Sequence, residues 1–363
     1  VRSRRQRQMC IRDRIGVGGR LMQAKGLESW VDMETLSVMG FGGALKAYRR
    51  LSNLADDLVE QVIKARPRLI LTVDNKGFAI RFATRLKRRM KAVGWSVPII
   101  HCVAPTVWAW GRWRAKKFAT IMDGLLCLFP FEPDYFKPFG LDAHFIGHPD
   151  AFGNYLAAKQ TGETIKEPRT KFNKIILLPG SRRSEISLIL PEMLAATSII
   201  KRHDPNLNFV LPAVPHLLPL IESLVEGSGV SILDQPEDLI PALQTSDAMI
   251  ATSGTITLQA ALCGTVGVTC YITGAFNGFI GRRLVDLDKV ILPNAILGRP
   301  LYPFYFQEAA TGKTLAAATL DCLYDANAKS SARHAAIELK SLLTGGAQSF
   351  DELVISALKN WLD

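Results

Sequence analysis

The sequence predicts an α/β protein made of two domains, each built on a parallel β-sheet. Short apolar runs alternate with longer stretches of helical periodicity, and this alternation is typical of βαβ units. With 363 residues the chain is long enough for two domains of ordinary size. The alternation pauses in the polar stretch 149–173 and restarts at Lys174. We therefore expect a domain boundary there and a ligand cleft between the domains.

The individual elements follow from the local patterns. Apolar runs predict buried strands over Leu69–Val73, Pro98–Val103, Gly124–Leu128, Ala143–Ile146, Lys174–Leu178, Phe209–Ala213, Val230–Leu233, Ala248–Ala251 and Val266–Tyr271. Helical periodicity predicts helices over 45–65, 78–93, 185–202, 216–227, 237–245 and 255–263. The stretch 333–362 is also helical in pattern, with a break at Thr344–Ala347. Residues 341–363 are expected to form a last helix that packs back on the first domain.

Composition excludes several classes of protein. Hydrophobic residues make up 48% and charged residues 21%, which is ordinary for a folded protein and unlike a disordered one. The sequence has no apolar run long enough for a membrane-spanning helix, and its opening residues lack the apolar core of a signal peptide. The six Cys are dispersed without a CxxC pair, which indicates a reducing cytoplasm and no structural zinc site.

The net charge of +11 is unevenly distributed. Residues 1–14 hold six Arg and one Asp without any periodicity, so we interpret them as a foreign or disordered leader. The segment 81–91 holds six cations and no acid, and 111–117 holds four more cations. These two segments are either solvated helix faces or a surface for anionic lipid or a phosphorylated substrate. No nucleic-acid-binding pattern accompanies them, so nucleic acid is not an expected partner.

Two predicted strand–helix turns have the chemistry of a phosphate site. They consist of Gly180, Ser181 and Arg182, and of Ser253, Gly254 and Thr255. A helix N-terminus offers N–H groups and a positive dipole end to an anion, and Arg182 can add a bidentate contact. The two turns could converge on one diphosphate at the carboxyl edge of a sheet, or they could be ordinary packing turns. Neither matches the Rossmann dinucleotide fingerprint or the P-loop.

Other candidates are less specific by themselves. Asp74 follows a buried strand, where a carboxylate can act as a general base, fix a substrate hydroxyl, or simply form the turn. The segment 101–117 combines Trp108, Trp110 and Trp113 with Arg112 and Arg114, as a clamp for a ligand or as a hydrophobic plug.

The last candidates lie in a loop and after a strand. The Pro- and aromatic-rich segment 292–308 predicts an ordered loop rather than a helix, with Asn294, Gln307 and Glu308 as polar groups that could face a nucleotide. His148 follows a predicted strand and either lines the cleft or is structural. The six His show no metal-ligand spacing, so we expect no metal site.

As a set, the motifs resemble the lipid-A-disaccharide synthase family. Those that carry the resemblance are GGRLMQAKGLESW (18–30), LSVMGF (36–41), APTVWAW (104–110), LFPFE (128–132), FIGHP (145–149), LLPGSR (177–182), SGT (253–255) and LPN…GRP (292–300). The resemblance implies a GT-B fold with two Rossmann-like domains, over 15–150 and 174–340. It also implies an inverting glycosyltransferase that needs no metal or other cofactor.

The family's reaction joins UDP-2,3-diacylglucosamine to 2,3-diacylglucosamine 1-phosphate, which yields the lipid A disaccharide 1-phosphate and UDP. Members act at the cytoplasmic face of the bacterial inner membrane, as peripheral proteins on an anionic surface, and can form homodimers. The resemblance implies that Asp74 is the base or orients the acceptor, and that Arg182 holds the diphosphate. Asn294, Gln307 and Glu308 match residues near the nucleotide.

On the acceptor side the resemblance places Trp108, Trp110, Arg112 and His148. Val38, Met39 and Phe41, followed by Lys46, Arg49 and Arg50, look like a segment that touches the membrane.

The sequence departs from the family at two places. A strand and a GExSGD-type turn normally open the family's fold, and the sequence lacks this unit, so we expect an N-terminally truncated member. Gln259 stands where the family usually has Glu, which changes the hydrogen bonds available to a ribose. Two alternatives therefore stay open: a catalytically inactive GT-B-like protein that binds lipid or nucleotide, and a sugar-nucleotide epimerase of related fold.

Overall fold

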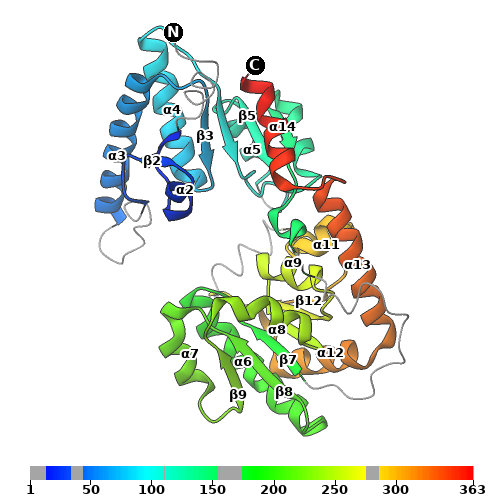
Figure 1. Cartoon of the computed structure of the whole chain (residues 1–363). Coiled ribbons are helices and arrows are strands. Elements are labelled where there is room, and N and C mark those ends of the chain that lie inside the picture. Colours follow the sequence, from blue (N-terminus) through cyan, green and yellow to red (C-terminus); the bar gives the residue numbers. More distant parts are fainter. Residues whose placement is uncertain are drawn as a thin grey trace. The chain divides into compact units, whose positions relative to one another are not determined.

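A computed structural model describes residues 14–33, 44–109, 111–153, 155, 174–274 and 286–362 (Figure 1). The chain divides into two compact units. Unit 1 comprises residues 1–102, 118–124 and Leu362, and unit 2 comprises residues 103–117, 125–361 and Asp363. Residues 156–173, within the expected boundary at 149–173, lie outside the described ranges. The boundary therefore stays a prediction.

Unit 1 contains two pairs of parallel strands. β1 (Arg14–Gly16) pairs with β2 (Leu27–Ser29), and the short helix α2 (Arg20–Ala24) joins them. β3 (Ile70–Val73) pairs with β4 (Ile99–Cys102), close to the ranges predicted from the sequence. The long helices α3 (Ala44–Ala65) and α4 (Lys76–Ala92) precede and follow β3, which confirms the βαβ pattern.

α3 and α4 lie side by side because each presents an apolar stripe at helical spacing. The buried residues are Ala55, Leu58, Val59 and Val62 of α3, and Ala79, Phe82, Ala83, Leu86 and Met90 of α4. Two ion pairs flank this contact, Arg85–Asp56 at 2.8 Å and Arg89–Glu60 at 2.6 Å. Both partners move forward by four residues between the pairs, so the two helices point in the same direction.

Unit 2 is built on a six-stranded parallel sheet. Its strands are β7 (Lys174–Leu178), β8 (Asn208–Pro212), β9 (Val230–Leu233), β10 (Ala248–Thr252), β11 (Gly267–Tyr271) and β12 (Phe304–Phe306). Their spatial order is β12-β11-β10-β7-β8-β9. The chain therefore runs outward from β7 to β9 and then returns to the other side of β7. This reversal between β7 and β10 is the topological switch point at which open α/β sheets bind their ligands.

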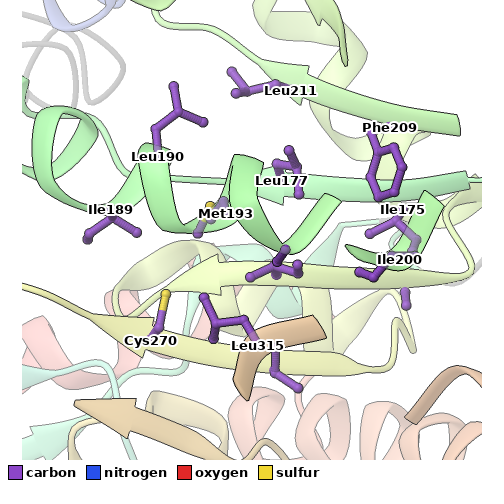
Figure 2. Packing of buried hydrophobic residues seen from close by; sticks show 14 of the residues in the cluster. Ile175, Leu177, Ile189, Leu190, Met193, Ile200, Phe209, Leu211, Cys270 and Leu315 are labelled. Atoms are coloured by element: carbon purple, nitrogen blue, oxygen red, sulfur yellow. The ribbon is translucent and has the colours of Figure 1, made fainter. Parts of the chain in front are cut away.

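Helices cover both faces of this sheet because successive side chains of a strand point to opposite sides. Ile175 and Leu177 of β7 belong to one buried cluster, with α6 (Arg183–His203), α7 (Leu218–Val225) and α12 (Gly312–Tyr324). Figure 2 shows these two residues with Met193 and Ile200 of α6. Ile176 and Leu178 belong to the other cluster, with α8 (Leu239–Thr245), α9 (Thr255–Leu262), α11 (Leu292–Leu297) and α13 (Ala326–Thr344).

Unit 2 also contains β6 (Asp142–Phe145) and most of β5 (Gly124–Cys127), two short strands. β5, whose first residue belongs to unit 1, neighbours β6, and α5 (Trp113–Ala119) precedes them. The C-terminal helix α14 (Phe350–Leu362) contacts β6, since the rings of Trp361 and His144 are 5.1 Å apart. The helical pattern over 333–362 and its break are confirmed by α13 and α14.

The expectation of a helix-free loop over 292–308 is wrong. Residues Leu292–Leu297 form α11, and Phe304–Phe306 form β12 at the edge of the sheet. Pro293 lies in the first turn of α11, where a missing N–H group costs nothing, and Gly298 ends the helix in the left-handed conformation. Pro293, one of the prolines that argued against a helix, therefore lies at its start.

Within the described residues, no helix combines the length and the apolar character that crossing a membrane requires. This agrees with the absence of long apolar runs in the sequence.

Replacing Leu177 with alanine is expected to lower the free energy of unfolding by about 2–5 kcal/mol. Leu177 is completely buried between β8, β10 and the helices on one face, so the truncation leaves a cavity that the packed sheet cannot close. Urea denaturation followed by circular dichroism measures the change. Leu188→Ala on α6 is the control, since this side chain is 41% exposed and its loss should cost much less. Equal midpoints for the two variants would contradict the prediction.

Candidate active site

The two predicted phosphate-binding turns lie next to each other in unit 2. β7 and β10 are paired in parallel, with Ala251 opposite Leu178, so both strands end at the same edge of the sheet. Gly180, Ser181 and Arg182 follow β7, and Ser253 and Gly254 follow β10 before α9 begins at Thr255. The structure therefore brings these turns together at the switch point, which is the arrangement that convergence on one diphosphate requires.

The first turn already binds a carboxylate of the protein itself, that of Glu185. The Glu185 carboxylate is 7% exposed, and its Oε2 accepts hydrogen bonds from the backbone N–H groups of Ser181 and Arg182, each at 3.2 Å. Its Oε1 lies 2.5 Å from Nη1 of Arg182. Gly180 has φ +106°, and a Cβ there would lie 2.5 Å from the same carboxylate. The expectation of unoccupied N–H groups is therefore wrong for Ser181 and Arg182.

The second turn keeps some of its backbone donors available to a ligand. Ser253 donates its N–H group to the carbonyl of Cys270 at 3.1 Å, which ties the turn to β11. Gly254 precedes α9 and has no side chain to cap the first turn. Thr257 donates its N–H group to the Gly254 carbonyl at 3.1 Å, and the N–H group of Thr255 makes no hydrogen bond within the described residues. The turn therefore has the geometry of an anion site.

Tyr271 and Gln307 lie at the same edge of the sheet, at the ends of β11 and β12. Burial raises the pKa of the Tyr271 phenol, the nearby Glu185 charge raises it further, and the Arg182 charge lowers it. Gln307 is buried with φ +54°, and its amide exchanges two hydrogen bonds with the backbone of Thr273, at 2.8 and 3.1 Å. A strained backbone at a sheet edge is typical of functional sites. Glu308, the neighbour of Gln307, is exposed.

Gln259 lies one helical turn after Thr255 and contacts an acid. Its Nε2 donates to Oδ2 of Asp150 at 3.2 Å. Burial and the neighbouring Asp150 carboxylate raise the pKa of Tyr155 to about 12, so this phenol stays protonated. Gln259, Asp150 and Tyr155 thus form a polar cluster beside the α9 turn.

His148 is 6% exposed and has structural partners. Its ring stacks on Phe129 with centroids 5.6 Å apart, and its Nδ1 accepts the backbone N–H of Asp150 at 3.2 Å. Burial lowers the pKa of His148, and the Asp150 charge opposes that shift only in part. These contacts favour the structural interpretation of His148.

Replacing His148 with asparagine is expected to make the protein less sensitive to acid. Because the folded-state pKa is lowered, the stability that neutral His148 contributes is present above about pH 6.5 and is lost as the pH falls below it. Asparagine can accept the Asp150 N–H without titrating. The free energy of unfolding should therefore change less between about pH 8 and about pH 5 in the variant. His216→Asn, at an exposed histidine, is the control, and an unchanged acid response in H148N would contradict the prediction.

The Asn294 side chain makes structural hydrogen bonds within unit 2. Its Nδ2 donates to the carbonyl of Tyr302 at 2.9 Å, and its Oδ1 accepts the N–H groups of Leu301 and Tyr302. These three bonds hold the loop between α11 and β12. Any nucleotide contact of Asn294 has to act through this loop or replace one of its bonds.

Trp108 also packs inside unit 2. It is 3% exposed, its Nε1 donates to buried Glu132 at 3.2 Å, and its ring contacts Phe129 and Phe131 edge-on. It borders a pocket of about 480 Å³ that is lined by Trp108, Pro130, Phe131, Tyr135, Lys289, Ala295, Ile296, Leu297 and Gly298. The exposed guanidinium of Arg112 lies 5.2 Å from the Tyr135 ring centroid. Trp108 therefore acts as a plug, and it also borders an aromatic pocket. Trp110 lies outside the described residues.

Asp74 lies at the carboxyl end of β3 in unit 1. The N-cap of α4 is Asn75, whose Oδ1 accepts the N–H of Phe78, so the turn does not need the Asp74 carboxylate. Asp74 and Asn75 both have positive φ, at 51° and 33°, which Asp and Asn tolerate better than most residues. Asp74 is exposed, and no hydrogen bond or ion pair involves its carboxylate among the residues that the structure describes. The side chain is thus free to meet a ligand.

The expected membrane-touching residues Val38, Met39 and Phe41 lie outside the described ranges, and Arg49 and Arg50 are exposed on α3.

Solved structures with the same fold define the class of the protein. The glycotransferase of kitacinnamycin aligns with a TM-score of 0.57, 14% identity and coverage of 97% of this chain and 98% of that chain. The UDP-GlcNAc 2-epimerase from Neisseria meningitidis bound to UDP-GlcNAc aligns with a TM-score of 0.60 and 11% identity, and the alignment covers 95% of this chain and 99% of that chain. MurG from Acinetobacter baumannii aligns with a TM-score of 0.51 and 14% identity, and the alignment covers 96% of this chain and 90% of that chain. The fold is that of GT-B glycosyltransferases, as expected.

Sequence comparison narrows this class to one family. The family described as lipid-A-disaccharide synthetase matches residues 6–356. The lipid-A-disaccharide synthase of Paraburkholderia phytofirmans is 35% identical over 350 residues, 95% of this chain and 88% of that protein. The one from Rhodospirillum centenum is 34% identical over 320 residues, covering 86% and 78%. The chain belongs to the lipid-A-disaccharide synthetase family, and it is a glycosyltransferase of lipid A biosynthesis. The match starts within residues 1–14, whose interpretation as a leader stays a prediction.

Sequence reasoning missed Glu185 and Asp150. Glu185 is the third residue of α6, where a carboxylate can reach back to the N-terminal N–H groups, and this spacing was the available signal. Asp150 had no comparable signal, because its partner Gln259 is 109 residues away.

Proposed function

We propose that the chain transfers the sugar of UDP-2,3-diacylglucosamine to 2,3-diacylglucosamine 1-phosphate. The observation that carries the proposal is the pair of strand–helix turns at the switch point of unit 2, with Arg182 in one of them. Membership of the family supports the same substrates. A diphosphate fits these turns because they combine the N-terminus of α9, with its backbone N–H groups, and the guanidinium of Arg182.

The reaction is a direct displacement with inversion. The 6-hydroxyl oxygen of the acceptor forms a bond to the anomeric carbon of the donor, while the bond from that carbon to the diphosphate oxygen breaks. UDP leaves with the electron pair. Asp74 receives the hydroxyl proton or orients the hydroxyl, and its exposed, uncapped carboxylate suits either role. The transition state resembles an oxocarbenium ion, as in other glycosyl chemistry.

Arg182 and the α9 turn stabilise the departing diphosphate in place of a metal ion. Arg182 is 74% exposed on its side chain, so its guanidinium can turn from Glu185 toward a ligand. Gly254 and Thr255 supply backbone donors at the same edge. Ser181 and Ser253 belong to the same two turns, and their N–H groups are bonded within the chain. Gln307 holds the loop after β11 in place, and Gln259 and Glu308 complete the nucleotide side of the proposal.

The protein also acts on substrates that are anchored in a membrane. We place it on the cytoplasmic face of the inner membrane as a peripheral protein, with Val38, Met39 and Phe41 as the touching segment. Trp108, Trp110, Arg112 and His148 belong to the acceptor side of the proposal, and a homodimer is the proposed assembly.

A disaccharide-forming assay tests the proposal. The chain as it stands is incubated with both diacylated sugars in detergent, and the release of UDP and the disaccharide product are followed together. We expect stoichiometric formation of both. UDP release without a disaccharide would show hydrolysis and contradict the proposal. A chain that binds UDP but forms no product would support the catalytically inactive alternative.

A further inference from the structure

We propose that a groove on α4 binds the phosphate monoester of the acceptor lipid. The groove has a volume of about 370 Å³ and lies in unit 1. Gly77, Ile80, Arg81, Thr84, Arg85 and Arg88 line it. These residues recur at intervals of three and four, so they form one face of the helix over three turns. This assignment rests on the proposed function, and it adds a second phosphate site to the one at the sheet edge of unit 2.

The groove gathers three of the four arginines of α4. α4 contains no acid, and two of its other cations are paired elsewhere, Lys87 with Asp123 and Arg89 with Glu60, both at 2.6 Å. Arg81, Arg85 and Arg88 line the groove, and Arg85 pairs with Asp56 of α3. The basic segment 81–91 thus contributes three arginines to the groove, while Lys87 and Arg89 pair with acids outside it.

Arg85 gives the groove a preorganised centre. Its Nε contacts Asp56 at 2.8 Å and its Nη2 donates to the Ser52 hydroxyl at 2.6 Å, so α3 fixes the guanidinium in one orientation. A guanidinium has five N–H donors, and these two contacts leave the others available. Arginine matches phosphate geometry in a bidentate manner, which a lysine cannot do.

The position of the groove fits an acceptor that reaches Asp74. α4 begins two residues after Asp74, and a rise of about 1.5 Å per residue places Gly77 in its first turn and Arg81 about 7.5 Å along the axis. Gly77 lies in the chain between Asp74 and Arg81, and a Cβ there would meet no atom within 4 Å, so the surface is open at this position. A sugar whose reacting hydroxyl lies at Asp74 would extend its 1-phosphate along this face toward the arginines.

Phosphate on a membrane lipid shares this chemistry, so the experiment has to separate the two sources. We measure binding of glucosamine 1-phosphate, of glucosamine, and of phosphatidylglycerol-containing vesicles to the full chain at one ionic strength. The groove variants are Arg88→Gln and the double variant R81Q/R88Q. Lys91→Gln is the matched control, because it removes the same charge from an exposed position of α4 outside the groove.

We expect the wild-type chain to prefer glucosamine 1-phosphate over glucosamine, and the double variant to lose about tenfold or more of that affinity. The single variant Arg88→Gln, at an exposed residue, should lose part of the affinity with its melting temperature unchanged. K91Q should stay within about twofold of wild type. Vesicle binding should fall equally in all variants of equal charge.

Two results would overturn the proposal. One is unchanged affinity for glucosamine 1-phosphate in the double variant. The other is a loss of vesicle binding confined to the groove variants, with no response to the sugar phosphate, which would assign the groove to lipid headgroups. Both readouts are binding measurements without donor, so they remain separate from a failure of the disaccharide assay, which would count against the proposed function instead.

Discussion

Replacing Asp74 with asparagine is expected to lower the rate of disaccharide formation by about 10²–10⁴-fold, the usual contribution of a general base. Asparagine has nearly the same shape but cannot accept a proton. The turn should survive, because Asn75 caps α4 and asparagine also tolerates a positive φ. Binding of UDP should stay unchanged, because its proposed contacts lie at the sheet edge of unit 2.

Initial rates and UDP affinity are measured for D74N beside Asp57→Asn, which neutralises an exposed carboxylate of α3 in the same unit. D57N should keep wild-type rates. A D74N protein with a full rate would remove Asp74 from the mechanism. A raised KM for the acceptor with kcat unchanged would assign Asp74 to orienting the acceptor rather than to proton transfer.

Replacing Arg182 with alanine is expected to lower kcat by about 10²–10³-fold, the loss that follows removal of one preorganised contact to a developing negative charge. The affinity for UDP should fall as well, because the variant also leaves the Glu185 carboxylate unbalanced at the mouth of the turn. Arg183→Ala is the matched control. It removes the same charge from the next, exposed residue.

The double variant R182A/E185Q separates two roles of Arg182. If Arg182 only neutralises Glu185, removing that carboxylate's charge should restore UDP affinity and rate to near wild type. If Arg182 contacts the diphosphate, as we propose, the double variant should recover part of the affinity and little of the rate. Calorimetric titration with UDP and the UDP-release assay give the two quantities. Full recovery would contradict the proposed contact, as would a loss in R183A equal to that in R182A.

Local patterns were sufficient for most of the secondary structure. β7 and β10 were predicted from unbroken apolar runs, because both faces of these strands are buried and every position is therefore apolar. β12 was missed, since three residues cannot show a period and the strand exists through its pairing with β11. α11 was missed because prolines were counted against a helix that has one in its first turn.

Less of the candidate site than of the secondary structure could be predicted from the sequence. The sequence alone identified the residues of both phosphate turns and the exposed Asp74, because a strand that ends at Gly or Asp before a helix is a local signal. What these side chains contact was decided by tertiary structure. Glu185 fills the turn at Ser181, and the Asn294 amide holds the loop at Tyr302.

By itself, then, the sequence determined the α/β class, the two strand–helix turns and the family. The tertiary structure decided that β7 and β10 are neighbours, which makes the two turns one site. It also decided that α3 pairs with Arg89 outside the groove of α4 and holds Arg85 inside it. The physical reason is distance along the chain. Periodicity and turn chemistry act between residues a few positions apart, whereas strand order and ion pairs such as Arg85–Asp56 join segments that only the fold brings together.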